Sequence, residues 1–438
     1  MYRTNGSALI FVGLFVSFFV LCLEELSWAE VHPGQTLTKE ALTEAGALLT
    51  PTTSWMLEQD MPMPVIATQP VRLPKAYREA TEQYAKQVEL SVDGQTLSGY
   101  VAGCPFPNVD INDPLAGHKI MWNFEQKPYD TVGTSYALGV VDRHGAFSQT
   151  VVSRWRRLRW RGRASLEPKP VISHNPPIQH TDLFGPLVYP EKWAGSVTLH
   201  IRYADVETPD DIYLYDTFSR RLRRLNTASS SDDTLGMGLD FDSSWGFNSK
   251  LSQWSFKVVA EKDILAIVHS GKHADSAAWC APRDAQRGLL AGLPCVSWEK
   301  RRVWVIEATP TGFELPYAYS KRVLYIDQDF YGLLVSDLYN QQQEFWKGYV
   351  NSFFYTKSPY QGYPNHPIEG GTYGYEDEWP FVTNFVFFDV QSETITVGEA
   401  PVLDPSVSPW RGDWYFNEGG PDNDPALHTR NNLIRRRH

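Results

Sequence analysis

Three groups of residues have types and spacing that could carry out chemistry, and the first is built around a serine. Residues 133–137 approach the Gly-x-Ser-x-Gly turn that exposes a nucleophilic serine, but the segment ends in alanine. That turn also requires a strand that leads directly into a helix. Here residues 136–141 have the composition of a continuing strand. We therefore regard Ser135 as a weak candidate nucleophile.

The second group consists of carboxylates. Asp240 and Asp242 project to the same side if residues 239–242 are extended, and residues 376–378 form a further acidic run. Paired carboxylates can act as a general acid and base or bind a metal ion. The 11 histidines are scattered, however, and none lies at ligand spacing near these acids. We predict solvated loop charges, with a hydrolase that uses Asp240, Asp242 or Ser135 as an alternative hypothesis.

The third group is basic. Residues 154–163 interleave arginines with tryptophans, and residues 220–224 form a second basic run. In a cytoplasmic protein this pattern would suggest RNA binding, but the net charge of -11 disfavours a nucleic acid partner. Two interpretations stay open. The runs dock to anionic lipid headgroups or an acidic partner, or they are strand-edge charges that prevent aggregation.

The first 29 residues have the pattern of a secretory signal peptide. Arg3 supplies the positive charge, residues 8–23 are nearly all apolar, and Ser27 and Ala29 are small residues at the cleavage-site positions. An uncleaved anchor helix is the alternative, but the apolar run is shorter than the roughly 20 residues that span a bilayer. We predict export of the chain and cleavage after Ala29.

Three cysteines follow the predicted cleavage site. Cys280 and Cys295 flank a loop punctuated by Gly and Pro, which favours a disulfide between them in an exported chain. Such a disulfide would stabilise the fold by roughly 3 kcal/mol in the chain-entropy model. Cys104 has no His or Lys close in the sequence to activate it, so we predict a buried, inert thiol.

Helical patterns are confined to the N-terminal part of the chain. Apolar residues at helical spacing predict helices over residues 38–49 and 75–90. A connector rich in Pro and Met, residues 51–74, separates them, and an Asp-Gly turn leads into a strand over residues 96–102. We expect the helices within residues 30–92 to fill the concave face of the sheet that follows.

Nearly every segment from residue 93 to residue 400 has the pattern of a strand. Sheets of about ten strands usually curl or close. We therefore predict one large curled antiparallel sheet, followed by an irregular tail over residues 401–438. Alternating apolar and polar residues and turn residues predict a strand over residues 197–203 and hairpins over residues 212–225, 254–269 and 381–397.

The stretch from residue 301 to residue 354 predicts four consecutive strands whose two faces are both apolar. In the first strand, Val303 and Val305 lie on one face while Trp304 and Ile306 lie on the other. A sheet with one solvated face would alternate apolar and polar residues. The short connections allow only antiparallel neighbours. Both faces must therefore be covered, and the second cover is either more protein or an apolar ligand.

Three segments together resemble a large family of exported proteobacterial proteins of unknown function that are described as outer-membrane lipoprotein-sorting-like. They are YVAGCPFPNVDINDPLAGHKIMWN at residues 100–123, DIYLYDTFSRRLRRL at residues 211–225, and VWVIEATP with RVLYIDQDF within residues 303–330. The similarity extends over residues 38–399. That family is similar to the LolA and LolB carriers, whose fold is an unclosed antiparallel half-barrel with a helical lid over an apolar cavity.

The resemblance implies a periplasmic binding or carrier protein of a Gram-negative bacterium, with a lipid or lipoprotein-like cargo. It also implies a partner in envelope transport, because members are found with resistance-nodulation-division exporters and outer-membrane channels. It carries over no catalytic residues, and we expect no metal or cofactor. The loop between Cys280 and Cys295 departs from the common pattern of the family.

A binding function needs apolar side chains around a groove and few polar anchors. The candidate lining residues are aromatic: Trp122, Trp245, Trp304, Tyr325 and Trp346. The sequence leaves open which pleat face lines the groove, because a one-residue shift in register exchanges the two sets of side chains. A binding protein is the first hypothesis, ahead of the exported hydrolase and of a ligand-free adaptor between the two membranes.

Overall fold

The computed structural model describes residues 31–141, 147–174, 177–225, 230–233, 236–269, 296–313, 317–357, 378–399, 414–416 and 424–435. Three predictions lie outside these residues: the signal peptide, the disulfide between Cys280 and Cys295, and the acidic residues 376 and 377. Within the described ranges, no helix has the length and apolar character needed to cross a membrane.

The main feature is an antiparallel sheet of 14 strands. Its strands are β5 (Thr131–Val141), β6 (Phe147–Arg159), β7 (Ile178–Phe184), β8 (Val197–Tyr203), β9 (Asp211–Asp216), β10 (Arg221–Leu225), β11 (Trp254–Ala266), β12 (Glu299–Pro310), β13 (Lys321–Asp327), β14 (Leu333–Tyr339), β15 (Phe345–Lys357), β16 (Glu378–Asp389), β17 (Thr394–Glu399) and β18 (Trp414–Phe416). They are hydrogen-bonded in the order β10-β9-β8-β7-β6-β5-β17-β16-β15-β14-β13-β12-β11, and β18 pairs with β5. Because β10 and β11 end this order, the sheet is open. The predicted mainly β, unclosed sheet is confirmed.

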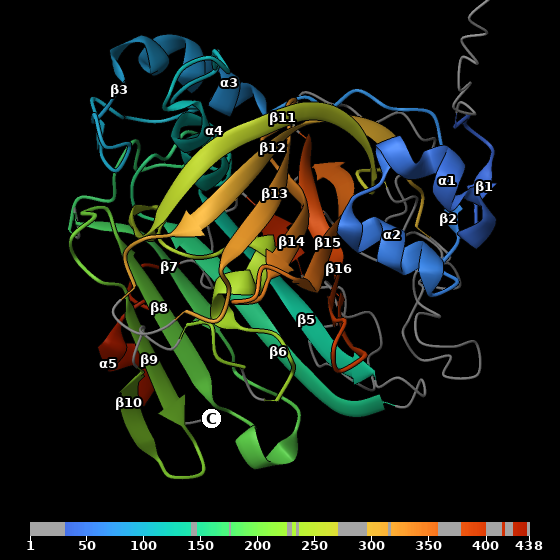
Figure 1. Ribbon diagram of the computed structural model, residues 1–438. Helices are drawn as coiled ribbons and strands as arrows, with labels where there is room; N and C mark the ends of the chain where they lie inside the picture. Colours follow the sequence, from blue (N-terminus) through green and yellow to red (C-terminus); the bar gives the residue numbers. More distant parts are fainter. Residues whose placement is uncertain are drawn as a thin grey trace, which may run out of the picture.

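The sheet curls so that its two halves face each other (Figure 1). Strands β11–β16 arch over strands β5–β10, and β17 connects the halves by pairing with both β16 and β5. Side chains from both halves share one apolar cluster, in which Val140 of β5 and Val151 of β6 join Trp304 and Leu324. The inward face of the sheet is therefore filled largely by its own side chains.

The helices lie at three places on this sheet. They are α1 (Leu42–Ala45), α2 (Pro51–Glu58), α3 (Lys75–Tyr84), α4 (Ala116–Glu125) and α5 (Arg430–Arg435), with 3-10 helices η1 (Lys39–Ala41), η2 (Gly46–Leu48), η3 (Ala85–Gln87), η4 (Glu191–Trp193), η6 (Phe241–Gly246) and η7 (Leu251–Gln253). Helices α1 and α2 pack on the outer face, α4 packs against β11, and α5 contacts β8 and β9. The prediction that the helices within residues 30–92 fill the concave face is therefore wrong for α1 and α2. Short two-stranded sheets join β1 (Thr36–Leu37) to β2 (Met63–Pro64) and β3 (Glu89–Leu90) to β4 (Leu97–Ser98).

The predicted four-strand meander corresponds to β12–β15, and protein covers both of its faces. Val303, Val305 and Tyr325 belong to an outer cluster that also contains Met56 and Leu57 of α2. Trp304 and Leu324 point the other way, into the inward cluster with residues of α4. The two-faced apolar pattern is thus explained by helices outside and by the opposite half of the sheet inside.

Several predicted elements need correction. The proposed hairpin over residues 254–269 is wrong, because β11 runs unbroken and Glu261, Lys262 and Asp263 pair with β12 in mid-strand. These charges lie on the edge strand of the sheet, where charged residues block further pairing. The connector of residues 51–74 contains α2, whose start is marked by Pro51 and a reciprocal capping box between Thr50 and Thr53.

The other corrections are smaller. The helix predicted over residues 75–90 ends at Tyr84 and continues as η3, and the strand predicted over residues 96–102 shrinks to β4. The helix predicted over residues 38–49 is broken into η1, α1 and η2. The tail contains β18 and α5, and α4 was not predicted.

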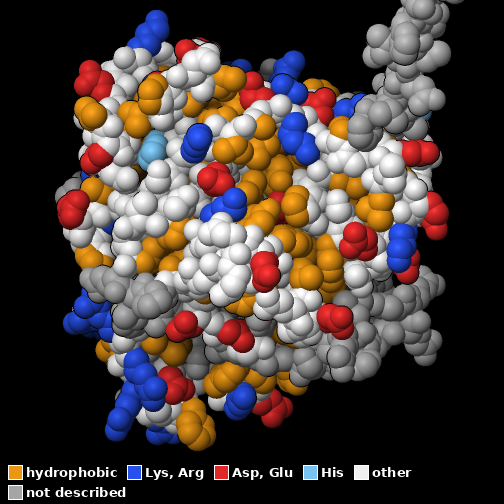
Figure 2. Space-filling view, in the orientation of Figure 1, with side chains coloured by type: hydrophobic (Ala, Val, Ile, Leu, Met, Phe, Trp, Pro, Cys, Tyr) orange, Lys and Arg blue, Asp and Glu red, His pale blue; other side chains and the backbone are white. Residues whose placement is uncertain are grey.

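The second basic run occupies the other edge of the sheet. Arg221, Arg223 and Arg224 are exposed on β10, the terminal strand of the order. Figure 2 shows Lys and Arg side chains at the corner of the molecule where Figure 1 places β10, whereas acidic and basic groups are interspersed elsewhere on this face. The position of this run fits the edge-charge interpretation.

Candidate functional site

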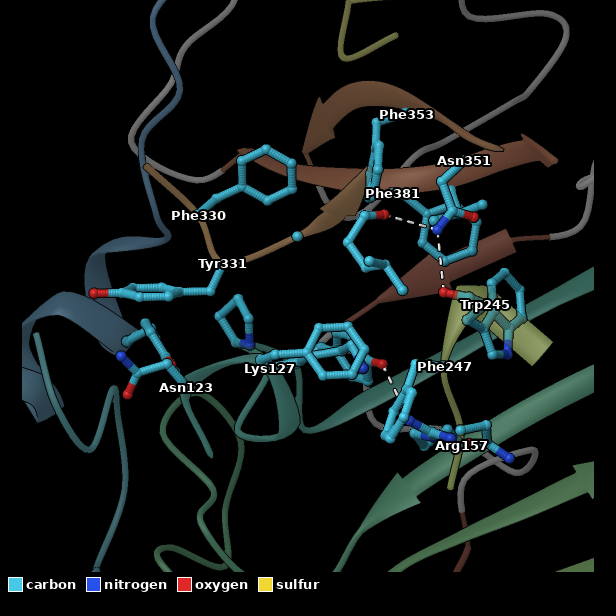
Figure 3. A pocket seen from close by; sticks show the side chains of 18 of the residues that line it. Asn123, Lys127, Arg157, Trp245, Phe247, Phe330, Tyr331, Asn351, Phe353 and Phe381 are labelled. Carbon is cyan, nitrogen blue, oxygen red and sulfur yellow. Dashed lines mark hydrogen bonds between the residues drawn. The ribbon is translucent and has the colours of Figure 1, made fainter. Parts of the chain in front are cut away.

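A pocket opens on the inward side of the curled sheet, between helices α3 and α4, the β13–β14 turn and strands β6, β15 and β16 (Figure 3). The empty space between its atoms is about 700 Å³, counting the open mouth. Its walls are mostly aromatic or aliphatic: Tyr77, Phe124, Pro128, Tyr129, Trp155, Trp245, Phe247, Phe330, Tyr331, Leu333, Phe353, Phe381 and Val382. The polar side chains are Asn123, Lys127, Arg157, Asn248 and Asn351.

The β13–β14 turn brings two rings to the pocket. Tyr331 adopts a φ of +57°, and its ring stacks on Trp304 with centroids 5.4 Å apart and planes at 18°. Its hydroxyl donates to the carbonyl of Pro107 at 3.3 Å. Phe330 contacts Phe353 of β15 edge to face, at 5.2 Å between centroids. The turn is therefore held from both sides, and its rings form a fixed wall.

The opposite wall contains a tryptophan in a strained backbone conformation. Trp245 in η6 has a φ of +60°, a left-handed conformation that L residues rarely adopt. Its ring lies 4.7 Å from that of Trp155, between centroids. The amide of Asn351 donates to the carbonyl of Trp245 at 3.1 Å and to that of Leu333 at 2.8 Å. One side chain of β15 thus fixes both η6 and the start of β14.

Lys127 is one of the two cationic residues that line this pocket, with Arg157. It follows α4 directly, ahead of Pro128, and its ammonium nitrogen lies 3.9 Å from the centre of the Phe124 ring. In Figure 3 the side chain lies between Tyr331 on one side and Arg157 and Phe247 on the other. Burial lowers the pKa of Lys127 to about 7, and the positive charges of Arg157, Arg159 and Arg202 act in the same direction against Glu125.

A buried network of ion pairs lies beneath the pocket. Arg157 donates from Nε to Oδ1 of Asp182 at 2.6 Å and from Nη2 to Oδ2 at 2.8 Å, and its Nη1 donates to the hydroxyl of Tyr129 at 3.3 Å. Burial alone would raise the pKa of Asp182, but Arg157 and His200 hold it well below its usual value. Arg202 and His200 pair in turn with Asp210, at 3.0 and 2.8 Å.

Within the described part of the chain, one group has the composition of a metal site. His180, Asp182 and His200 offer ligand atoms within 4.8 Å of one another, and zinc accepts such donors. Both oxygens of Asp182 are already bound by Arg157, however, and His200 bridges Asp182 and Asp210. A divalent cation would have to share these carboxylates with a guanidinium. We therefore describe the group as a buried ion-pair core.

A comparison with known protein families shows to which family this chain belongs. The family model described as protein of unknown function, DUF1329, matches residues 36–410. The chain belongs to the DUF1329 family. The resemblance stated from the sequence is thereby confirmed at the family level, over almost the same residues.

Three proteins that are similar to this DUF1329 protein are remote from it in sequence. An uncharacterised protein of Pseudomonas aeruginosa is 25% identical over 337 residues, which are 73% of this chain and 69% of that protein. A crystal structure of a DUF1329 family protein from Desulfovibrio piger is similar over 74% of this chain and all of its own, at 13% identity and a TM-score of 0.47. A LolA superfamily protein from Nitrosomonas europaea is similar over 70% of this chain and 94% of its own, at 11% identity and a TM-score of 0.38. At these scores the two structures say nothing of what the pocket holds.

The residues proposed for hydrolysis are engaged elsewhere in this DUF1329 protein. Ser135 is fully buried in the middle of β5, opposite Arg154 of β6, and the strand continues to Val141 without the helix that a nucleophile elbow needs. The segment therefore has the geometry of an ordinary strand.

The prediction that Asp240 and Asp242 are solvated is wrong, because they are 1% and 3% exposed. Asp240 accepts from the backbone nitrogen of Ser243 at 2.7 Å, as the N-cap of η6, and from the hydroxyl of Tyr319. Asp242 accepts from the hydroxyl of Tyr317 at 3.0 Å, and burial raises its pKa. Arg322, at 3.6 Å from Asp240, supplies the compensating charge. These partners come from residues 317–322, which sequence spacing could not connect with residue 240.

Both interpretations of the first basic run are wrong. Arg156, Arg157 and Arg159 are at most 5% exposed, on a strand that has neighbours on both sides. Arg156 donates to the carbonyl of Gly185 at 2.7 Å, and Arg159 donates to Gln126 Oε1 at 2.6 Å. The run forms internal ion pairs and hydrogen bonds and not a docking surface. Cys104 is buried as predicted, and burial raises the pKa of its thiol to about 12.

The structure distributes the five predicted aromatic residues over different places. Trp245 lines the pocket. Trp304 lies behind it, stacked on Tyr331, and Trp122 donates from Nε1 to the carbonyl of Gly94 at 3.1 Å beside a second, smaller pocket. Tyr325 lies on the outer face, where its hydroxyl donates to Asp337 at 2.8 Å. Trp346 packs against Tyr319, 5.5 Å away between centroids, outside the pocket.

Sequence reasoning missed the residues that give the pocket its character, Phe124 and Lys127 above all. A signal for them exists, because Ile120 and Phe124 are four residues apart and Pro128 marks a stop for the helix. The contributions of Trp155, Phe353 and Phe381 depend on how strands far apart in the chain curl around one space. No local pattern predicts that arrangement.

Proposed function

We propose that this protein is a periplasmic binding or carrier protein for a hydrophobic ligand, a lipid or lipoprotein-like cargo, that serves an envelope transport system. The main support for this proposal is the aromatic pocket on the inward side of the curled sheet. Ligand sites are typically concave, mostly apolar and equipped with a few polar anchors. This pocket has that composition, with its polar groups gathered around Lys127, Arg157 and Asn351.

The volume and the rigidity of the walls support a small apolar guest. The 700 Å³ between the lining atoms includes open solvent at the mouth, so this value is an upper limit on the size of a guest. The walls are preformed, because Asn351 fixes η6 and β14 and the rings of Phe330 and Tyr331 are packed from behind. A preformed site avoids the free-energy cost of ordering loops upon binding.

The positions of the polar residues also favour a binding function over a hydrolase. The hydroxyl of Ser135 lies inside a strand, and Asp240 and Asp242 are enclosed by Arg322 and two tyrosines. A hydrolase needs its nucleophile or general base within reach of a substrate. We therefore propose that the protein binds its ligand and does not transform it.

The first test is whether the purified protein carries or takes up an apolar molecule. The chain would be exported in a Gram-negative host, purified without detergent and extracted for lipid mass spectrometry, and its uptake of N-phenyl-1-naphthylamine would be followed by fluorescence. Substitution of Val382, a lining residue, by Trp should fill the pocket and weaken probe binding at least tenfold. The matched control is Val92→Trp, at a residue that is 96% exposed. Absence of lipid-like species together with no probe uptake by the unsubstituted protein would refute the proposal.

A further inference from the structure

We propose that Lys127 is the anchor for an anionic headgroup, and that the ligand is a single-chain amphiphile with a carboxylate at one end. This inference rests on the proposed binding function and adds the chemical class of the ligand. It assigns the hydrocarbon chain to the aromatic walls and the carboxylate to the lysine nitrogen at the centre of the pocket.

The first argument is that the ammonium group of Lys127 lacks an anionic partner. Among the described residues it forms no ion pair and no hydrogen bond. Its nitrogen lies over the Phe124 ring, 3.9 Å from the ring centre. A cation over an aromatic ring is stabilised by about 0.5–2 kcal/mol. That contact does not substitute for a carboxylate partner when the ammonium group is partly buried. A lysine in such surroundings is a site at which an anionic ligand would be stabilised.

The second argument is that the neighbouring charges are already used. Both oxygens of Asp182 accept from the Arg157 guanidinium, and Asp210 accepts from Arg202 at 3.0 Å. Glu125 accepts from Gln179 at 3.0 Å and lies 3.6 Å from Arg202. None of these acids forms an ion pair with Lys127. The charged or titratable groups that act on the site from the surrounding elements are Glu125 of α4, Tyr77 of α3, Tyr129 before β5, Arg157 and Arg159 of β6, Arg202 of β8 and Tyr331 of the β13–β14 turn.

The third argument comes from the walls. Around Lys127 the pocket offers the rings of Phe124, Tyr129 and Tyr331, and further in those of Phe353 and Phe381. Asn123 is occupied, since its amide exchanges hydrogen bonds with the backbone of Phe106 at 2.9 and 2.7 Å. The lining thus combines one available cation with apolar surface, and a fatty-acid-like molecule has the matching distribution of charge and hydrocarbon.

The pH dependence follows from the same site. The pKa of Lys127 is lowered to about 7, first by burial and then by the nearby arginines. A carboxylate binds the protonated amine, so its affinity should fall as the pH rises above 7. An uncharged ligand of the same shape should bind equally well at both ends of that range, because it has no charge to pair.

The experiment compares cis-parinaric acid with its methyl ester, at concentrations below micelle formation, by fluorescence titration of the full mature chain. The unsubstituted protein should bind the acid at least tenfold more tightly than the ester at pH 6.5. Lys127→Met should remove that preference, whereas Lys127→Arg should retain it. The matched control is Lys192→Met, because Lys192 also lies over an aromatic ring, at 4.2 Å from the centre of Trp193, but outside the pocket.

The possible outcomes separate the two proposals. If neither probe binds the unsubstituted protein, the binding function itself fails. If both bind equally and Lys127→Met changes neither, the pocket holds apolar ligands but Lys127 is not their anchor, and the inference is overturned. If Lys127→Met does not fold, the unsubstituted protein still decides, because equal affinity for the acid and the ester at pH 6.5 would overturn the inference.

Discussion

Asp337 of β14 binds the first turn of α2 through Thr52, a residue 285 positions earlier in the chain. One carboxylate oxygen accepts from the backbone nitrogen of Thr52 at 3.1 Å and from its hydroxyl at 2.5 Å. The other accepts from the hydroxyl of Tyr325 at 2.8 Å. Negative charge at a helix N-terminus is favourable, so this acid fastens the outer helices to the sheet.

The first prediction concerns the pH dependence of that contact. Burial raises the pKa of Asp337 to about 6, despite its hydrogen bonds. The folded state therefore binds this proton more tightly than the unfolded state, whose pKa is near 3.9. The resulting contribution is present below pH 4 and is lost as the pH rises through about 6. Over that interval the free energy of unfolding should fall by up to about 3 kcal/mol on account of this group.

Asp337→Asn removes the titration but keeps the acceptor for Thr52. The difference in unfolding free energy between this variant and the unsubstituted protein, from urea denaturation at pH 4, 5.5 and 7, should shift in favour of the variant as the pH rises. Asp263→Asn is the control, because the side chains of the ion pair between Asp263 and Arg302 are largely exposed. A difference that stays constant from pH 4 to 7 would show that Asp337 does not titrate in this range.

The second prediction concerns the buried pair of Arg157 and Asp182, whose side chains are 6% and 0% exposed. Asp182→Asn leaves a buried guanidinium without its counter-charge, and such a loss typically costs about 3–5 kcal/mol of stability. Arg224→Met removes an arginine that is 63% exposed from its pair with Asp211 and should cost less than about 1 kcal/mol. Denaturant unfolding measures both. Equal effects of the two substitutions would contradict the assignment of the first basic run to the interior.

The strands and the N-terminal helices differ in how far they could be predicted from the sequence. Period-two alternation located β8, and turn residues located the hairpin of β9 and β10. The β12–β15 meander was located because strands buried on both faces leave a continuous apolar pattern. The unclosed sheet followed from the number of strands and from the family resemblance. The N-terminal helices were found only in part, since α2 begins with threonines whose role depends on Asp337.

The pocket could not be predicted to the same degree. Sequence reasoning ranked residues by size and aromaticity, and of the five it chose only Trp245 lines the main pocket. Charges were misjudged for a related reason. Arg157 and Asp182 lie 25 residues apart and neutralise each other only once β6 and β7 are adjacent. A charged run in a sequence carries no sign of whether its partner exists elsewhere in the fold.

The third prediction concerns His180, which is buried and has no hydrogen-bond partner for either ring nitrogen in the described part of the chain. Burial and the charge of Arg157 hold its pKa well below the usual value. The unfolded state therefore binds this proton more tightly, and stability is lost as the pH falls below about 6.5, at up to about 1.4 kcal/mol per pH unit. His180→Phe should remove that loss.

Unfolding at pH 7, 6 and 5 tests this expectation. The unfolding free energy of His180→Phe should rise relative to that of the unsubstituted protein with each step toward acid. The curve of His32→Phe, at an exposed histidine, should run parallel to that of the unsubstituted protein. Because Asp337 acts with the opposite sign between pH 4 and 6, the comparison uses differences between variants and not the shape of a single curve. Parallel curves for His180→Phe would mean that His180 has the same pKa in the folded and unfolded states.

The last prediction separates the two roles of Trp245. Its φ of +60° costs a residue with a Cβ about 1–2 kcal/mol, and glycine avoids this cost. Trp245→Gly and Trp245→Ala both remove the ring that packs against Trp155, 4.7 Å away, and should weaken binding of N-phenyl-1-naphthylamine equally. They should differ in stability, with the glycine variant more stable by about 1 kcal/mol. Trp193 in η4 lies outside the left-handed region, so there the order should reverse and alanine should be the more stable choice. Alanine more stable than glycine at residue 245 would mean that η6 does not hold Trp245 in this conformation in solution.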